Sequence, residues 1–352
     1  MPRPASLVLS LSLLVSFTAI SQQQLATSPA EANPPQAAVE KSSKKAPLPV
    51  SEIHNPTLWH EPGKIESLDL YAGQGGNDKA PAEPFTFLEE DTDGTNPKFD
   101  VRDAVGKKWR VKLGEEARPE VVASRLLWAM GYYVNDDYVL EAAEIPGIKL
   151  SRGDDDAKKG HIRQARFSRK PGGQDKIAIW LWGDNPFKGT REFNGLRVMM
   201  AVMNNWDLKD ENNAVYLDKK SGKQIFLVND VGATFGTNGL SWTKARSKGN
   251  IGSFRESKFI TRMGDTDVDF ATPKQPNFLI GVANPKRYAM RIDLDWIGNK
   301  IPRNDARWMG EMLGRLSHKQ LVNAFRAGHF PIDQIDAYVE IVESRIRELK
   351  EL

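Results

Sequence analysis

The sequence of 352 residues contains no cysteine. This absence excludes disulfide bonds, thiol nucleophiles and metal sites built on thiolates. A compartment outside the cytoplasm is therefore allowed but not required. The chain also has little net charge, +3, because 49 Lys and Arg face 46 Asp and Glu. So small an excess gives no reason to expect nucleic acid as a partner.

Long apolar runs are scarce too, and the run at the N-terminus is shorter than the roughly 20 residues of a membrane span. It covers residues 7–20, follows Arg3 and ends at a small-x-small triplet, residues 19–21. This pattern predicts a secretory signal peptide over Met1–Ser21. A buried N-terminal helix and an uncleaved anchor are the alternatives. We therefore expect an exported protein, periplasmic or extracellular, whose mature form has no transmembrane span.

Residues 22–50 lack any hydrophobic period and are rich in Ala, Pro, Ser, Gln and Lys. This composition predicts a disordered linker. Residues 51–83 form an N-terminal extension, and strand-like patterns begin at residue 84. The 40% hydrophobic and 27% charged composition of the chain is typical of globular proteins.

The most specific signal lies in residues 204–236. Asp207 is followed five residues later by Asn212, and a hairpin with arms at 214–218 and 224–228 leads to Asp230 and Gly232. A tight hairpin brings its two ends to one edge, so Asn212 and Asp230 are expected to face the same point. Their amide and carboxylate oxygens are ligands that suit Mg²⁺. A helix with Thr190 as its N-cap precedes the stretch, with apolar residues at helical spacing, Leu196, Met199, Met200 and Met203.

Two other interpretations of this stretch stay open. Asp, Asn and Gly are turn residues, so a loop and hairpin without chemistry has the same composition. A calcium loop would use Asp207, Asp210 and Asn212, but the glycine and the terminal glutamate of such loops are missing.

Three strands are predicted upstream at 85–89, 98–103 and 108–113. In the third strand Lys112 lies on the face opposite Trp109 and Val111, so we expect it to contribute little to stability. A helix follows, with Pro119 in its first turn and Gly131 at its end. Its Glu120 is the expected partner of Lys112, with Glu116 as the alternative.

A phosphate-binding glycine loop of the form G-x-G-x-x-G is absent. The loop at residues 91–97 is the nearest substitute. Backbone N–H groups at Gly94 and Thr95 are its candidate phosphate contacts.

Taken together, the motifs resemble the protein-kinase-like superfamily in its atypical branches, namely HipA-type kinases, phosphatidylinositol kinases and secreted CotH-like kinases. The resemblance rests on Val111-Lys112, the helix of Glu120, the Asp207–Asn212 spacing and Asp230-Val231-Gly232. The chain departs from the pattern where Trp206 precedes Asp207, since a His-Arg-Asp triplet is missing.

The resemblance implies a two-lobed α+β fold, with a small antiparallel-sheet N-lobe at 84–170 and a mostly helical C-lobe at 171–352. It implies transfer of the ATP γ-phosphoryl group to a hydroxyl of a protein, lipid or sugar. Lys112, positioned by Glu120, would hold the phosphates, Asn212 and Asp230 would hold Mg²⁺ or Mn²⁺, and Asp207 would orient the acceptor. A base pocket is expected near residues 165–170.

Two functions of other kinds remain open. A kinase fold can bind ligands without catalysis. Trp180 and Trp182 alternate along a predicted strand and could form a sugar-stacking platform of a glycan-binding protein, although core packing at the lobe interface explains the same spacing. The C-terminal part is predicted to be helical over 305–316, after a capping box of Ser317 and Gln320, and from Pro331 onward.

Overall fold

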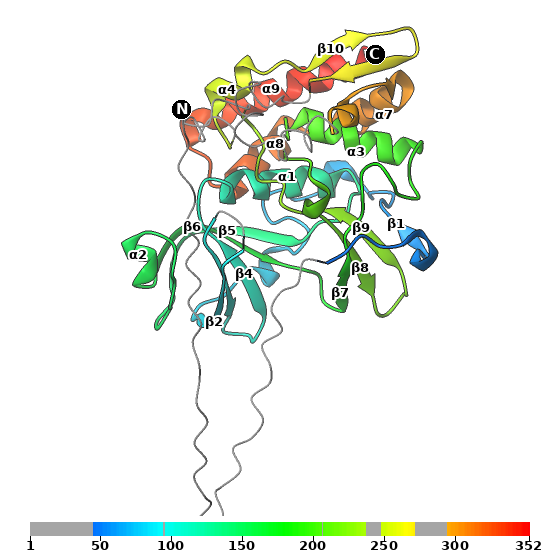
Figure 1. The fold of residues 1–352 in the computed structure, drawn as a ribbon. Helices are drawn as coiled ribbons and strands as arrows, with labels where there is room; N and C mark the ends of the chain where they lie inside the picture. Colours follow the sequence, from blue (N-terminus) through cyan, green and yellow to red (C-terminus); the bar gives the residue numbers. More distant parts are fainter. Residues whose placement is uncertain (1–44, 94–95, 206, 237–247, 272–293) are drawn as a thin grey trace, which may run out of the picture. The chain divides into compact units, whose positions relative to one another are not determined.

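The structure, a computed structural model, describes residues 45–93, 96–205, 207–236, 248–271 and 294–352. These residues form an α+β fold (Figure 1), which confirms the predicted class. The strands are β1 (Pro56–Thr57), β2 (Thr86–Asp91), β3 (Lys98–Arg102), β4 (Lys108–Lys112), β5 (Asp136–Glu144), β6 (His161–Arg169), β7 (Gln174–Ala178), β8 (Asn213–Asp218), β9 (Gln224–Val228), β10 (Ile260–Met263), β11 (Asp267–Phe270) and β12 (Ile301–Pro302). The helices are α1 (Ala117–Ala129), α2 (Asp155–Lys158), α3 (Arg191–Val202), α4 (Ile251–Glu256), α7 (Arg303–Leu313), α8 (His318–Ala327) and α9 (Ile332–Lys350).

A five-stranded antiparallel sheet has the order β2-β3-β4-β6-β5. The three strands predicted first correspond to β2, β3 and β4, with ends shifted by at most two residues. One face of this sheet packs its own apolar core, in which Phe99, Trp109, Val111 and Phe167 are fully buried. That burial follows from strand alternation, because residues 109 and 111 point to the same side.

Helix α1 follows β4 directly and packs against both the sheet and α8 (Figure 1). Gly114, at φ 98°, makes the turn between strand and helix. The helix begins at Ala117, so Pro119 occupies its first turn as predicted. The helix contacts two different parts of the fold. Val121 packs with Val139 of β5, and Leu126 is part of the larger helical core.

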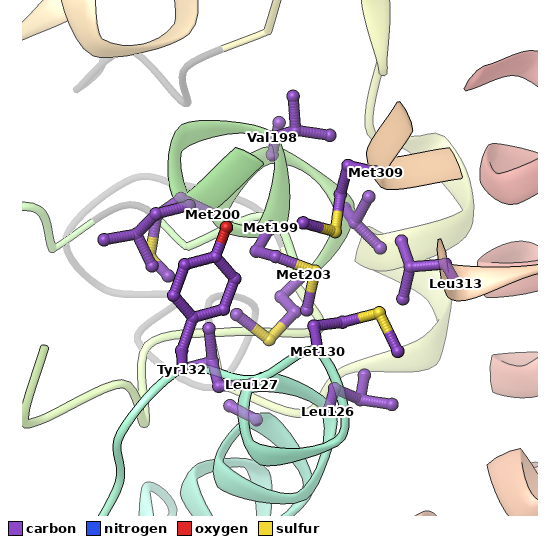
Figure 2. Packing of buried hydrophobic residues seen from close by; sticks show 14 of the residues in the cluster. Leu126, Leu127, Met130, Tyr132, Val198, Met199, Met200, Met203, Met309 and Leu313 are labelled. Atoms are coloured by element: carbon purple, nitrogen blue, oxygen red, sulfur yellow. The ribbon is translucent and has the colours of Figure 1, made fainter. Parts of the chain in front are cut away.

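The larger hydrophobic core contains Met199, Met200 and Met203, which have helical spacing in the sequence. Figure 2 shows Met199 of α3 and Met203, just after α3, facing Met130, just after α1, and Met309 of α7. The predicted N-cap is present, because the Thr190 hydroxyl accepts a hydrogen bond from the Phe193 N–H. Unbranched methionines adapt to irregular gaps, which suits a site where three helices meet.

A second sheet, β1-β9-β8-β7, carries the predicted hairpin as β8 and β9. The two arms pair antiparallel, with Asn213 opposite Val228. Its other neighbours are a strand just before α3 and a short strand, β1, of the N-terminal extension. The hairpin prediction is therefore confirmed, and the extension adds an edge strand that the sequence did not reveal.

The extension is part of the core. Leu58, Ile65 and Leu70 are buried, and Gln320 Nε2 donates to the carbonyls of Ile65 and Leu68 at 2.8 and 3.0 Å. Gln320 also completes the predicted capping box with Ser317. Of the predicted linker, residues 45–50 lie in the described part, where Leu48 N–H donates to the Ile179 carbonyl at 2.9 Å; residues 22–44 and the predicted signal peptide lie outside it.

The proposed aromatic platform is wrong. Trp180 and Trp182 are 3% and 0% exposed, and their rings pack against each other with centroids 4.8 Å apart. Trp180 Nε1 is used within the fold, since it donates to the Leu227 carbonyl at 2.9 Å. These indoles are core, so neither offers a ring face to a sugar. Within the described ranges, the helices are too short or too polar to cross a bilayer.

Candidate active site

Lys112 is the last residue of β4 and points away from the sheet core, toward α1. It is buried, with 7% of its surface exposed. The sequence placed it correctly on the face opposite Trp109, but the expectation of a weakly involved lysine is wrong. That face is covered by the beginning of α1, so the ammonium group lies among carboxylates rather than in solvent.

Three carboxylates contact the Lys112 ammonium group. Its Nζ lies 2.6 Å from Glu116 Oε2, 3.4 Å from Glu120 Oε2 and 2.5 Å from Asp230 Oδ1. The predicted partner, Glu120, and its alternative, Glu116, are thus both in contact, with Glu116 nearer. The turn at Gly114 explains this, because it starts the helix immediately after the strand and brings both residues back over Lys112.

Asp230 reaches the site from the hairpin. It follows the end of β9 and has φ 55°, a left-handed conformation that costs an L-residue energy unless its surroundings hold it. Gly232 lies against α1: a Cβ there would stand 2.7 Å from Glu116 Cβ and 2.8 Å from the Glu116 carbonyl oxygen. The Asp-x-Gly sequence therefore has a steric reason, since only glycine lets the chain pass this close.

Asp207 and Asn212 lie at the same open end of the hairpin, just before its first strand, β8. Asn212 Nδ2 donates to the Asp207 carbonyl at 2.7 Å and to Asp207 Oδ2 at 3.2 Å. The Asn212 carbonyl in turn accepts from the Asn229 N–H at 2.7 Å, so Asn212 lies beside the residue that precedes Asp230. The structure thus brings together five predicted residues, Lys112, Glu120, Asp207, Asn212 and Asp230, and also Glu116, the alternative partner of Lys112.

The pKa values at the site are set by burial and by the contacts between its cations and its carboxylates. The protein atoms around the partly exposed Asp230 carboxylate would by themselves raise its pKa, but Lys112, Arg166 and Lys209 outweigh this effect and lower that pKa. Burial likewise opposes the charge of Lys112, yet Glu120, Asp230 and Glu116 raise its pKa. Burial raises the pKa of Glu120 to about 7, against the opposing effect of Arg166 and Lys112. Lys112 is therefore held as an ammonium ion.

The donor set fits a hard cation that is also bound by phosphates. Asn212 uses its N–H₂ group on Asp207, which leaves its amide oxygen as a possible ligand. Asp230 is 44% exposed at its side chain and has a second carboxylate oxygen besides the one on Lys112. Two oxygen ligands are what Mg²⁺ takes from protein when substrate phosphates and water supply the rest. In the described ranges no three His, Asp or Glu side chains group into a metal site.

The calcium-loop alternative loses one of its ligands. The Asp210 carboxylate accepts from the Trp182 N–H at 2.8 Å and so holds the chain before α3. The 3₁₀ turn Asp210–Asn212 then leads straight into β8. Asp210 is a structural residue of this turn.

Other predicted positions lie elsewhere. Gly94 and Thr95 fall outside the described residues, although neighbouring Asn96 donates from Nδ2 to Glu116 Oε2 at 2.6 Å and so lies near Lys112. A cavity of about 550 Å³ lies between Leu113, Pro119, Lys248 and Phe330. It is not lined by residues 165–170, so the base pocket expected there stays a prediction.

Three cations at the site were not predicted from the sequence. Lys209 Nζ lies 2.7 Å from Asp207 Oδ1, Lys248 Nζ lies 2.6 Å from Glu116 Oε1, and Arg166 Nη1 pairs with Glu120 Oε1. Lys209 had a signal, since it stands two residues after Asp207 in the same loop. Arg166 and Lys248 had none, because only the tertiary fold brings them to the acids.

Comparison with known proteins adds little. No family model matches the chain, and no curated protein matches it. The crystal structure of a Helicobacter pylori proinflammatory kinase, CtkA, is similar with a TM-score of 0.35 and 10% sequence identity, over 75% of this chain and 97% of that chain. A likeness this distant shows neither fold nor function.

Proposed function

We propose that the chain is an exported kinase-like phosphotransferase that moves the ATP γ-phosphoryl group to an acceptor hydroxyl with Mg²⁺ or Mn²⁺. The observation that carries this is the position of Lys112. One buried lysine on the third strand of the sheet contacts a glutamate of the following helix and the aspartate that ends the hairpin. A strand lysine paired with a helix glutamate, beside a metal-binding aspartate, is the arrangement of kinases.

The roles follow from position. Lys112 lies where an ammonium ion can leave its carboxylates and bind nucleotide phosphates, while Glu120 orients it. Asn212 and Asp230 supply the protein oxygens for the metal, which would neutralise charge on the phosphates when bound. Asp207 lies at the start of the same hairpin and would accept the proton of the attacking hydroxyl. As the new O–P bond forms, the bond to ADP breaks.

Lys209 fits this assignment as a second cation near the transferring group. Its Nζ lies 2.7 and 2.9 Å from the two oxygens of Asp207, and its charge also lowers the pKa of Asp230. Phosphoryl transfer relies on positioned charge more than on covalent chemistry. A cation paired with Asp207 in this loop therefore fits the catalytic role that we propose for it.

A kinase-fold protein that binds without catalysis is the second candidate. It is favoured by the missing glycine-rich loop and by the export we propose, because little ATP is found outside the cytoplasm. The two candidates differ in Asp207, which a mere nucleotide binder does not need.

A thermal-shift series tests both candidates together, with ATP alone, Mg²⁺ or Mn²⁺ alone, the metal with ATP, and an oligosaccharide mixture as the control. The proposal predicts a larger rise in Tm for metal with ATP than for either alone, because binding to the folded state stabilises it. A rise with oligosaccharide and none with nucleotide would overturn it. Radiolabelled ATP then separates transfer from binding.

A further inference from the structure

The carboxylate of Glu120 is held between two cations from neighbouring strands. Lys112 and Arg166 lie opposite each other across the β4–β6 ladder, so their side chains share one face of the sheet. Lys112 Nζ lies 3.4 Å from Glu120 Oε2, and Arg166 Nη1 makes a closer ion pair with Oε1. Glu120 is 2% exposed, and burial makes a carboxylate dependent on such partners.

A second polar contact lies one helical turn further along α1. Ser124 Oγ donates to Asp137 Oδ2 of β5 at 2.6 Å, and both residues are buried. Ser124 is four residues after Glu120, so both side chains project from the same face of the helix. This face of α1 is thus joined to the sheet by polar contacts at Glu120 and at Ser124.

The Lys112 ammonium group cannot contact nucleotide phosphates and keep all of its carboxylate contacts during the proposed reaction. This single group already contacts Glu116, Glu120 and Asp230. Nucleotide phosphates would compete with these carboxylates for the same ammonium group, and the contact with Glu120 is already the longest of the three. Glu116 keeps Lys248 as a second cation, and for Glu120 the corresponding second cation is Arg166.

We propose that Arg166 is a positioning residue that holds Glu120, and through it α1, in place while Lys112 binds phosphate. The inference rests on the proposed function for its catalytic part; the anchoring of α1 by Arg166 stands on the ion pair alone. The role that we propose for Arg166 requires no contact with the phosphates. Arg166 acts through Glu120, and its planar guanidinium group suits a fixed carboxylate better than a flexible lysine does.

The test compares Arg166→Met and Arg166→Lys with Arg163→Met, a control at an exposed position of the same strand. Hydrogen exchange of residues 117–129 is measured with and without Mg-ATP, beside kcat and KM for ATP. Arg166→Met is expected to speed exchange in α1 and to lower kcat/KM about 10²-fold, the scale of a misplaced reacting group. Arg166→Lys should recover part of both, and Arg163→Met should change neither.

The outcomes separate the two claims. Wild-type exchange in α1 of folded Arg166→Met would overturn the anchoring role, whatever the activity. If that variant does not fold, Arg166→Lys decides: α1 exchange and kcat/KM equal to wild type would contradict the need for a fixed guanidinium group. A wild-type protein that neither binds nor turns over ATP would sink the proposed function, while faster α1 exchange in Arg166→Met would still support the anchoring.

Discussion

Lys112 Nζ lies 2.5 Å from Asp230 Oδ1, although 118 residues separate the two in sequence. The contact joins the end of β4 to the end of β9, and hence the five-stranded sheet to the hairpin. A lysine that served only the sheet would not need an acid from the hairpin. The pair therefore makes Lys112 important for the fold as well as for the proposed chemistry.

Replacing Lys112 with alanine is expected to lower the free energy of unfolding by about 3 kcal/mol, because it leaves buried carboxylates without their shared cation. The figure lies at the low end for a broken buried pair, since Arg166 and Lys248 keep partners for Glu120 and Glu116. Urea unfolding measures it. Lys108→Ala is the control on the same strand. Its side chain is 52% exposed, and its buried partner Asp100 keeps Arg110, so its loss is expected to cost about 0–1 kcal/mol. Equal losses in the two variants would contradict the buried position of Lys112.

Lowering the pH should reduce the difference in unfolding free energy between wild type and Lys112→Ala. Burial would raise the pKa of Glu116, but Lys112 and Lys248 lower it below its ordinary value of 4.5. A carboxyl with a lowered pKa stabilises the fold above its ordinary pKa, and this contribution is lost as the pH falls through the folded-state pKa. Unfolding free energies measured from about pH 7 down to about pH 2 should therefore differ by a constant amount above pH 4.5, the ordinary pKa of Glu116, and converge below it. A gap that stays constant over the whole range would show that charge is not the reason for the loss.

Gly232→Ala should disturb the site by a steric clash, without changing any charge. The added Cβ would press on the Glu116 backbone oxygen, which belongs to the start of α1 and cannot rotate away. We expect a loss of about 1–3 kcal/mol in unfolding free energy, as for overpacking elsewhere, together with weaker ATP binding. Gly172→Ala serves as the control, because nothing lies within 4 Å of its added Cβ. Full activity in Gly232→Ala would rule out a tight passage at this point.

Export is tested by the N-terminus of the native protein. The apolar run and its small-x-small triplet predict that the mature chain begins near Gln22. Edman sequencing or terminal-peptide mass spectrometry of protein from the native host measures this. Recovery of intact residues 1–21 on a cytoplasmic product would contradict export.

The features that could be predicted from sequence were local ones. Thr190 and Ser317 cap their helices because the bonds span three residues, and the hairpin formed because its turn and both arms are adjacent in the chain. The meeting of Asn212 with the end of the hairpin followed from the same geometry. The proximity of Lys112 to Glu116 and Glu120 could also be predicted, because only a short turn separates the strand from the helix.

The rest depended on strand pairing that sequence does not encode locally. Arg166 faces Glu120 only because β6 pairs with β4, although β5 comes between them in the chain. The pairing of Arg166 with Lys112 cannot be read from the sequence, because it depends on the register of β6 against β4. The burial of Lys112 was missed partly for the same reason, because Asp230, which contacts it together with the glutamates at the start of α1, lies far along the chain. The alternation of Trp180 and Trp182 fits both a sugar-binding platform and a buried core. The contacts of Trp180 with β9 identify it as core.

The central claim is that Asp207 and Asp230 have different roles at one phosphoryl-transfer site. Titration calorimetry with Mg-ATP, run beside a phosphate-transfer assay on Asp207→Asn and Asp230→Asn, tests it most directly. Asp230→Asn should weaken the Mg²⁺-dependent part of ATP binding as well as turnover, because a metal ligand acts in the ground state and in the transition state. Asp207→Asn should bind Mg-ATP nearly as wild type does, while transfer falls by about 10²–10⁴-fold. Equal loss of binding in both variants would contradict the two roles, and unchanged binding and transfer in both would leave this stretch a loop and hairpin without chemistry.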